Sequence, residues 1–295
     1  MSRVLYYLFI WPLSKLPLRV LYGLSGILFL VGYRLVGYRK QVVRQNMQRS
    51  FPEKSPAEIT VLMRRFYRHF FDSLIESLRG LTMPRSEYLK RVPLTNPEIL
   101  QPYFEEGRSV MIVAGHYNNW EWSALALAMQ IPHQTGAVYK PLRNAFVDNL
   151  VQKTRSRFGM LLINQHDSAR WIIQHRQDRI AYYFLSDQSP TFAKKVHWTT
   201  FLNQDTAVFM GAERIAQRFD MPLFFIKVHR RGRGHYAMTL ELLEEQSATQ
   251  PEGALTELHV RKLEEEIQNN PETWLWTHKR WKRRRSRKSE AGHER

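Results

Sequence analysis

The sequence predicts an α/β fold in which a mixed sheet is flanked by helices and an N-terminal hydrophobic helix anchors the chain to a membrane. From Glu98 onward, apolar runs of strand length alternate with stretches of helical periodicity. Residues 1–50 combine two apolar runs with Arg and Lys and contain no Asp or Glu. The chain has 295 residues, of which 43% are hydrophobic, which excludes a disordered protein and allows a large core.

The N-terminal segment is predicted to be a retained anchor. The apolar runs Val4–Leu13 and Val20–Tyr33 are each shorter than the roughly 20 residues of a routine spanning helix. A signal peptide fits poorly, because bulky residues stand where a small-residue cleavage site would follow. Two arrangements stay open, a span centred on Val20–Val36 or a helix lying in the interface. The basic residues that follow directly place the rest of the chain in the cytoplasm.

We expect four parts along the chain. Residues 1–38 form the anchor, residues 39–97 a helical segment packed on the core, residues 98–282 the α/β core, and residues 283–295 a basic tail. Within the helical segment, Ser55-Pro56 predicts a helix start. The apolar residues Phe66, Phe70, Leu74 and Leu78 recur at helical spacing and predict a stripe facing the core. Pro84–Pro97 resembles a linker.

The α/β core is expected to contain six strands and five helices. The strands are Val110–Ala114, Gly136–Tyr139, Leu161–Asn164, Ile180–Leu185, Leu223–Val228 and Tyr236–Leu242. The helices are Trp122–Met129, Phe146–Phe158, Ser168–His175, an amphipathic helix that opens at Thr206, and Glu257–Asn269.

The stretch Ser109–Trp122, SVMIVAGHYNNWEW, carries the candidate catalytic residues His116 and Glu121. On one continuous helix, a spacing of five positions would put the two side chains about 140° apart. They can meet only if His116 lies in the turn after the strand and Glu121 in the first turn of the helix. His116 would then act as a general base on a substrate hydroxyl, and Glu121 would orient the imidazole. The alternative is a capping box with Asn118 as N-cap and Glu121 at N3.

A second polar cluster, Ser186–Pro190, follows the expected strand Ile180–Leu185 and includes Asp187 and Gln188. Ligands of open α/β folds bind at the carboxyl ends of the strands. Two polar clusters at the ends of two strands therefore predict a functional site at one edge of the sheet.

Charge and missing motifs narrow the function. The formal net charge of +17 calls for an anionic partner, which could be nucleic acid, acidic lipid or an acidic carrier protein.

The chain has no cysteine, which excludes disulfides, thiolate metal sites and a cysteine nucleophile. No HExxH, P-loop, strand-linked GxGxxG or GxSxG motif occurs, so no metal or nucleotide site is expected. A nucleic-acid binder is the runner-up, since Trp276 and Trp281 lie among basic residues, but the anchor favours lipid. A non-catalytic membrane scaffold would leave the two strand-end clusters without a role.

Taken together, these motifs resemble the bacterial lipid A biosynthesis acyltransferases, the late or secondary lauroyl/myristoyl acyltransferase family. That family belongs to the glycerolipid acyltransferase superfamily, which is marked by His-x4-Asp/Glu. The resemblance extends over nearly the whole chain, and it rests on the anchor, Arg44–Pro52 (RQNMQRSFP), GHYNNWEW, Arg155/Arg157–Gly159, Asp187-Gln188, Thr206–Gly211 (TAVFMG) and Trp276–Lys282 (WTHKRWK).

The resemblance implies a glycerolipid-acyltransferase-like fold and transfer of a fatty acyl group to a hydroxyl of a Kdo-bearing lipid A precursor. The donor would be acyl carrier protein or coenzyme A, with no cofactor and no metal. Arg155 or Arg157 would supply charge at the thioester oxyanion or bind an acceptor phosphate, and Asp187 would order these arginines or the pocket. Lys140 is assigned to substrate binding with them. The expected partners are acyl carrier protein, a phosphorylated glycolipid and the anionic surface of the bacterial inner membrane, and not nucleic acid. The alternative is an acyltransferase for another lyso-lipid or glycolipid.

Overall fold

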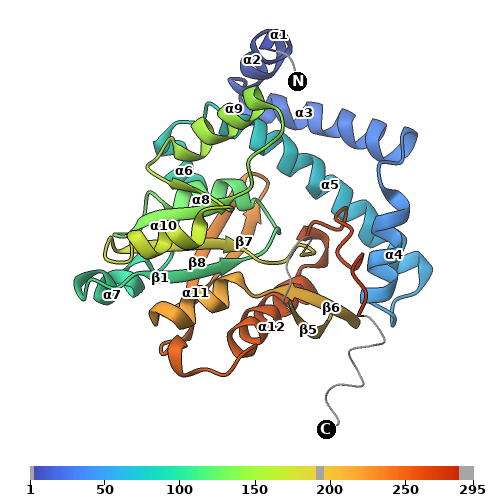
Figure 1. Cartoon of the computed structure of the whole chain (residues 1–295). Helices are drawn as coiled ribbons and strands as arrows, with labels where there is room; N and C mark the ends of the chain where they lie inside the picture. Colours follow the sequence, from blue (N-terminus) through green and yellow to red (C-terminus); the bar gives the residue numbers. More distant parts are fainter. Residues whose placement is uncertain (1–2, 191–195, 286–295) are drawn as a thin grey trace.

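The computed structural model describes residues 3–190 and 196–285, so the end of the predicted basic tail, residues 286–295, lies outside the described part. A six-stranded mixed sheet forms the centre, with the strand order β3-β2-β4-β1-β7-β8 (Figure 1). Its strands are β1 Val110–Ala114, β2 Gln134–Tyr139, β3 Leu161–Asn164, β4 Ile180–Leu185, β7 Leu223–Gly232 and β8 His235–Glu244. The first five run parallel and β8 pairs antiparallel with β7. The predicted α/β class with a mixed sheet is therefore confirmed.

The central strand β1 pairs with β4 on one side and β7 on the other. All five of its residues are buried, as expected for a strand covered by helices on both faces. Its register pairs Ala114 with Leu185, so β1 and β4 end side by side. The polar residues that follow the two strands consequently start from neighbouring points.

Helices cover both faces of the sheet. α11 and α12 lie on one face, while α6 and α8 lie on the other beneath α5 (Figure 1). The helices are α1 Arg3–Leu5, α2 Trp11–Ser14, α3 Leu18–Phe29, α4 Lys40–Ser50, α5 Pro56–Gly80, α6 Arg85–Arg91, α7 Gln101–Glu105, α8 Trp120–Leu127, α9 Ala145–Ser156, α10 Ser168–Gln174, α11 Gly211–Phe219 and α12 Ala254–Asn269. Two π-helical segments, Tyr6–Ile10 and Leu30–Leu35, join α1 to α2 and continue α3.

The prediction that a helix begins at Thr206 is wrong. Residues Gln204–Phe209 form strand β6, which pairs antiparallel with β5 Val196–Phe201 in a separate hairpin. Leu202 and Asn203 make the two-residue turn with φ values of 49° and 61°, the conformation that tight hairpins need. This pairing overrides the apolar spacing, and α11 begins only at Gly211.

Two predictions in the helical segment also need correction. Pro84–Pro97 is not simply a linker, because it contains α6, which packs against α8 and β8. Of the predicted core stripe, Phe66 is buried, but the side chain of Leu74 is 46% exposed. The helix start at Ser55-Pro56 is confirmed, since Ser55 and Glu58 form a capping box at the beginning of α5.

The apolar N-terminal helix is present. The stretch Leu18–Leu35, α3 with its π-helical continuation, is long and apolar enough to cross a membrane by length and composition. It does not stand apart from the rest of the chain, because α3 packs along α5 (Figure 1).

Two buried histidines, His69 and His259, and the half-buried His278 predict that the protein loses stability in mild acid. Burial lowers the pKa of His69 to about 3 and those of His259 and His278 to about 4. In the unfolded chain a histidine titrates near pH 6.5. Between about pH 6.5 and 4 the unfolded state therefore binds protons that the folded state does not, and the free energy of unfolding falls as the pH falls. Each histidine contributes up to about 1.4 kcal/mol per pH unit.

Thermal unfolding in detergent at a series of pH values measures this effect. We expect Tm to fall steadily below pH 6.5, and to fall less steeply in His69→Gln. His166→Gln is the matched control, because His166 is exposed. A Tm that is constant down to pH 4 would contradict the prediction.

Candidate active site

The turn that carries His116 is held by the end of the chain. Leu275 donates its backbone N–H to the carbonyl of His116 (3.0 Å), and Asn118 donates its own to Thr273 (3.0 Å). Gly115 permits this tight course, because a Cβ at that position would lie 2.6 Å from the side chain of Leu263 in α12. The strand end, α12 and the C-terminal segment together fix the position of the histidine.

His116 is bound to Asp187 and not to Glu121. Its Nδ1 lies 2.6 Å from Oδ1 of Asp187, and its backbone N–H donates to Oδ2 of the same carboxylate at 2.8 Å. The two residues are 71 positions apart and meet because β1 and β4 end side by side. The predicted convergence of the two polar clusters at one sheet edge is confirmed.

The Asp187 carboxylate is buried and accepts a third hydrogen bond, from the indole N–H of Trp274 at 2.8 Å. Burial alone would raise the pKa of this group. The charge of His116 and the three hydrogen bonds outweigh burial and hold the pKa well below its usual range. Asp187 is therefore an anion at every working pH, and it favours the histidine tautomer with a proton on Nδ1.

With Nδ1 engaged, Nε2 is the ring nitrogen left for proton transfer. Nε2 lies 3.2 Å from the amide nitrogen of the exposed side chain of Gln188. The ring of Trp120 stands edge-on to the imidazole, with 5.3 Å between ring centroids. The side chain of His116 keeps 15% of its surface exposed, so a substrate that displaces Gln188 can reach Nε2.

Glu121 forms a second pair, with Arg155. Its two carboxylate oxygens accept from Nε and Nη2 of the guanidinium at 3.2 and 2.6 Å, a bidentate ion pair. In the structure the carboxylate of Glu121 is turned to the arginine, and the carboxylate on the ring of His116 is that of Asp187. Burial raises the pKa of Tyr183, and the negative charges of both Glu121 and Asp187 raise it further.

The expected capping box is shifted by one residue. Asn119, not Asn118, caps α8 by accepting from the backbone N–H of Trp122 (3.0 Å). Asn118 adopts a left-handed conformation (φ 51°), and its amide donates to the carbonyl of Val228 (2.6 Å). Glu121 thus lies in the first turn of α8 but does not complete a capping box.

The other predicted site residues lie in different surroundings. Arg157 donates to the carbonyls of Gly80, Leu81 and Met83 at 2.9 to 3.0 Å, so its guanidinium closes the C-terminal end of α5. Lys140 follows β2 at the carboxyl edge of the sheet and is exposed. Of the two candidate arginines, only Arg155 is paired with a residue of the predicted catalytic motif.

Several residues of the site were missed by the sequence reasoning. Trp274 binds Asp187, and His278 accepts the backbone N–H of Ser189 at 3.1 Å. Arg280 is a buried cation; burial lowers its pKa to about 10, and the charge of Asp187 opposes that shift. These residues belong to the C-terminal segment, which is rich in Trp and basic residues. Its composition does not indicate that it folds back onto the His116 turn.

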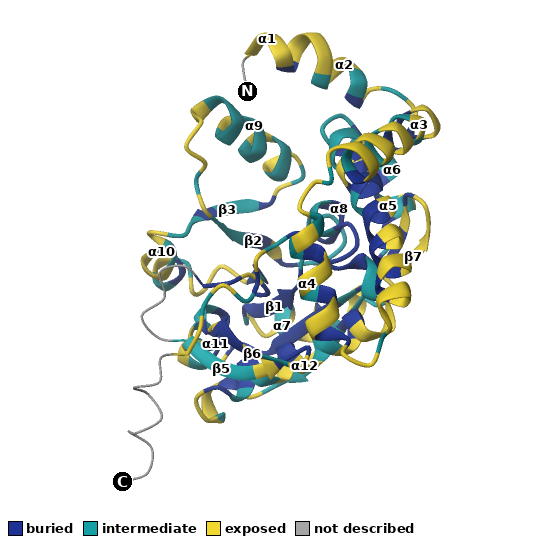
Figure 2. Cartoon of the chain, turned by 90° about the vertical axis from the view of Figure 1, so that its right-hand side faces the viewer, coloured by how far each residue is buried: buried dark blue, intermediate teal, exposed yellow. Residues whose placement is uncertain are grey.

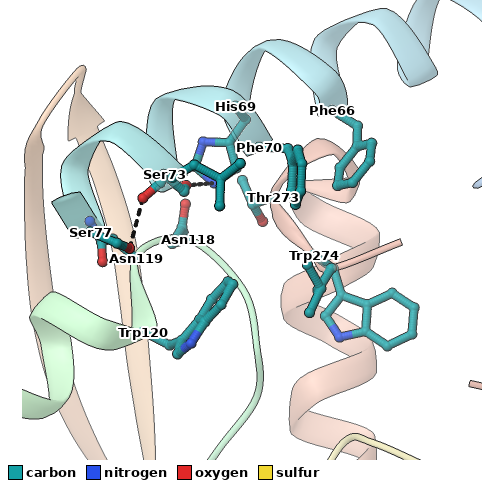
Figure 3. Close-up of a pocket in the computed structure, with 12 residues that line it drawn as sticks. Phe66, His69, Phe70, Ser73, Ser77, Asn118, Asn119, Trp120, Thr273 and Trp274 are labelled. Carbon is teal, nitrogen blue, oxygen red and sulfur yellow. Dashed lines mark hydrogen bonds between the residues drawn. The ribbon is translucent and has the colours of Figure 1, made fainter. Parts of the chain in front are cut away.

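A small apolar hollow lies beside Trp120, between α5 and the His116 turn (Figure 3). Half of its lining residues are aromatic or aliphatic and half carry hydroxyl, amide or imidazole groups, but the surface that they present to the hollow is almost entirely apolar. Phe66, Phe70 and Leu74 contribute from α5, and Trp274 and Leu275 from the C-terminal segment. A hydrocarbon chain fits this chemistry. Within residues 3–190 and 196–285, no three His, Asp or Glu side chains are grouped as a metal would need.

Comparison with known proteins gives the site its family. The profile of the bacterial lipid A biosynthesis acyltransferases matches residues 2–283. The chain belongs to this family. It is therefore an acyltransferase, and the His116–Asp187 and Glu121–Arg155 pairs are the candidate catalytic groups of a lipid A acyltransferase fold.

The curated relatives are distant but cover most of the chain. The lipid A biosynthesis palmitoleoyltransferase of Escherichia coli K12 is 21% identical over 276 residues, which is 93% of this chain and 89% of the relative. The lipid A biosynthesis acyltransferase 2 of Shigella flexneri is 22% identical over 251 residues, 83% of this chain and 78% of the relative.

We expect substitution of Arg157 to affect stability and substitution of Arg155 to affect activity. Arg157→Ala leaves three carbonyls without a charged donor and should lower the stability by about 1–2 kcal/mol, with little change in kcat of the folded protein. Arg155→Ala should leave Tm nearly unchanged and lower kcat by roughly 10²-fold, if its charge acts on the reacting groups. Thermal unfolding and acyl-transfer rates, measured on both variants in parallel, separate the two roles. A loss of activity confined to Arg157→Ala would reverse this assignment.

Proposed function

We propose that the protein transfers a fatty acyl group from acyl carrier protein to a hydroxyl of a lipid A precursor, at the cytoplasmic face of the inner membrane. The observation that carries the proposal is the buried Asp187 carboxylate on Nδ1 of His116, with Nε2 left toward the opening of the site. This is the arrangement of a general base whose tautomer is fixed. The family to which the chain belongs supplies the class of reaction.

In the proposed reaction, Nε2 of His116 removes the proton of the acceptor hydroxyl. The hydroxyl oxygen forms a bond to the thioester carbonyl carbon, and the C–S bond of the donor then breaks. The leaving thiolate takes the proton back from the imidazolium. Asp187 stabilises that imidazolium and keeps the ring in place, because the carboxylate also binds the backbone N–H of His116.

Arg155 is the proposed source of positive charge for the thioester oxyanion or for a phosphate of the acceptor. Glu121 holds its guanidinium from one edge by two hydrogen bonds, which leaves further N–H donors of the fork for the substrate. Glu121 thus takes part by orienting the arginine instead of the histidine.

An acidic donor and a phosphorylated acceptor agree with the charge around the site. An open hollow is lined by Trp281 and four arginines, Arg49, Arg283, Arg284 and Arg285, of which Arg285 pairs with Asp205 in the same hollow at 3.2 Å. The hollow borders the site, since Arg283 donates to the carbonyl of Pro190, three residues after Asp187 (3.3 Å). Guanidinium groups suit phosphates and the carboxylates of an acidic carrier protein alike.

The first test is acyl transfer with the membrane-extracted protein, read by mass spectrometry. The donors are acyl carrier protein loaded with chains of several lengths, with acyl coenzyme A in a parallel series, and the acceptor is a Kdo-bearing tetra-acylated lipid A precursor. We expect one new ester on the precursor. His116→Ala should abolish the product and Asp187→Asn should lower kcat by roughly 10³-fold or more.

His166→Ala serves as the matched control, because His166 is an exposed histidine that follows β3, three strands away from β1 in the sheet. Wild-type turnover by a folded His116→Ala variant would end the mechanism. A product formed only with other lyso-lipid or glycolipid acceptors would keep the mechanism and replace the lipid A precursor by the alternative acceptor.

The apolar hollow beside Trp120 gives a prediction about the donor chain. Ser77 lies on its wall, on α5 (Figure 3). Ser77→Phe should fill part of the hollow and lower kcat/KM for the longest accepted donor by roughly 10-fold, while shorter donors react as before. Ser77→Ala, which adds no bulk, is the control. An equal loss with all chain lengths would show that the acyl chain lies elsewhere.

A further inference from the structure

The N-terminal helix α3 turns Leu18, Leu21 and the hydroxyl groups of Tyr22 and Ser25 toward the protein, and its other face exposes apolar side chains. Tyr22 donates to Oε1 of Glu76 at 2.7 Å, and Ser25 donates to Oδ1 of Asp72 at 2.6 Å. On the opposite side, Val20 is 56% and Ile27 60% exposed. A helix on the surface of a water-soluble protein has the reverse arrangement. Figure 2 shows that exposed residues also predominate in the helices before α3.

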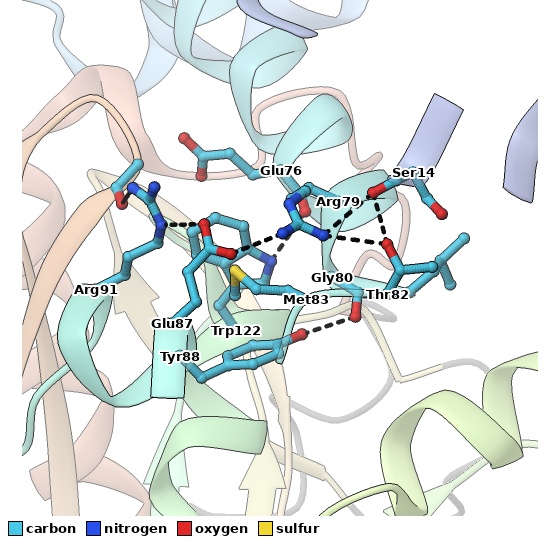
Figure 4. A network of polar contacts seen from close by, with 12 residues as sticks. Ser14, Glu76, Arg79, Gly80, Thr82, Met83, Glu87, Tyr88, Arg91 and Trp122 are labelled. Carbon is cyan, nitrogen blue, oxygen red and sulfur yellow. Dashed lines mark hydrogen bonds and ion pairs between the residues drawn. The ribbon is translucent and has the colours of Figure 1, made fainter. Parts of the chain in front are cut away.

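α3 is fastened to α5 along its whole length. Before α3 begins, Arg79 and Thr82 both donate to the carbonyl of Ser14, the last residue of α2, at 3.3 and 2.6 Å (Figure 4). In the π-helical continuation of α3, the ring of Tyr33 lies 4.9 Å from that of Tyr67. The hydroxyl bonds of Tyr22 and Ser25 lie between these two points. The two helices therefore run side by side and antiparallel from one end of α3 to the other (Figure 1).

Charged residues of α5 lie beneath α3, beside the aromatic rings of Tyr67 and Phe71 that face its π-helical continuation. Asp72 and Glu76 are both buried, and Asp72 also pairs with Arg233 of the β7–β8 hairpin at 2.5 Å. The guanidinium of Arg233 lies 4.1 Å from the ring centroid of Tyr22. The guanidinium of Arg68 on α5 lies 5.5 Å from the ring centroid of Phe29, near the end of α3. α3 therefore packs on a network of ion pairs and hydrogen bonds formed by α5 and the β7–β8 hairpin.

These contacts are incompatible with a membrane-spanning α3 for two reasons. If α3 crossed the bilayer with α5 beside it, Arg68, Asp72 and the carboxyl group of Glu76 would enter the hydrocarbon, which is costly for each charged or polar group. If α3 left α5 in order to cross alone, the buried carboxylates of Asp72 and Glu76 would lose their donors from α3. Each of these two arrangements is therefore less favourable than the position that α3 has in the structure.

We propose that α3 lies in the plane of the membrane interface, with its outer face in the lipid and its inner face on α5, so that the protein is monotopic. The outer face of α3 and its π-helical continuation consists of Val20, Ile27, Leu30, Val31 and Leu35, which are all exposed. Such a face buried at the boundary of headgroups and acyl chains gives binding that scales with the apolar area.

The basic residues around α3 indicate that its outer face contacts an anionic lipid surface. Arg19 and Arg34 lie at its two ends and are exposed, and residues 1–50 contain no acidic residue. Arg231, also exposed, belongs to the same hairpin as Arg233. Basic groups next to an apolar face are attracted to the phosphates of the cytoplasmic leaflet.

The absence of cysteine from the chain allows a clean test of topology. Single cysteines at Tyr7 and Gln45, before and after α3, would be labelled with an impermeant maleimide in membrane vesicles of known orientation. A monotopic protein exposes both positions on the cytoplasmic face. A spanning helix exposes them on opposite faces, and that result would overturn the proposal.

Depth of insertion gives a second, independent reading. A fluorophore on Val20→Cys, Ile27→Cys or Leu35→Cys would be quenched by lipids that carry a nitroxide at a defined depth, in vesicles containing phosphatidylglycerol. We expect strong quenching at one common, shallow depth for all three positions. Leu21→Cys is the matched control, because Leu21 is fully buried against the protein and should be protected from quenching.

A depth profile with Ile27 near the bilayer centre would overturn the proposal, and so would the absence of lipid quenching at Ile27. The second outcome would mean that another protein surface covers the outer face. Neither measurement depends on acyl transfer, so failure of the topology and failure of the proposed function can be told apart.

Discussion

The site depends on one buried carboxylate. Asp187 binds the ring and the backbone of His116 and the indole of Trp274, so it ties together the end of β1, the end of β4 and the C-terminal segment. A buried anion of this kind is tolerated only when donors surround it. The carboxylate therefore constrains the fold as well as the chemistry, because losing any one of the three segments would leave a charge uncompensated in the interior.

The sequence predicted the parts of the site that depend on local pattern. Apolar runs of strand length located β1 and β4, and the polar residues after them located His116 and Asp187 at the same edge of the sheet. The sequence did not reveal which carboxylate faces the histidine. Glu121 was favoured because it is near in sequence, whereas Asp187 is 71 positions away. Pairing across such a distance follows from strand register, which a single sequence does not report.

The remaining errors also come from long-range structure. The spacing around Thr206 suits an amphipathic helix, but antiparallel pairing with β5 decides for a strand. Trp274 and Arg280 stood in a segment whose tryptophans and basic residues suggested nucleic acid or lipid. Their place beside Asp187 results from the folding back of the chain end, with Leu275 bonded to the His116 turn. Local propensity carries no record of either contact.

Glu76 joins two regions that are usually considered separately. Its carboxylate accepts from Tyr22 of the N-terminal helix, from Tyr236 of the sheet, and from Asn119, the residue that caps α8 beside Glu121. Deleting the N-terminal hydrophobic segment to obtain a soluble fragment would therefore not be a neutral step. It would remove a donor from a buried acid that also supports the active-site turn, and uncover the apolar side of α5. Low activity or aggregation of such a fragment would report on the missing helix and not on the catalytic residues.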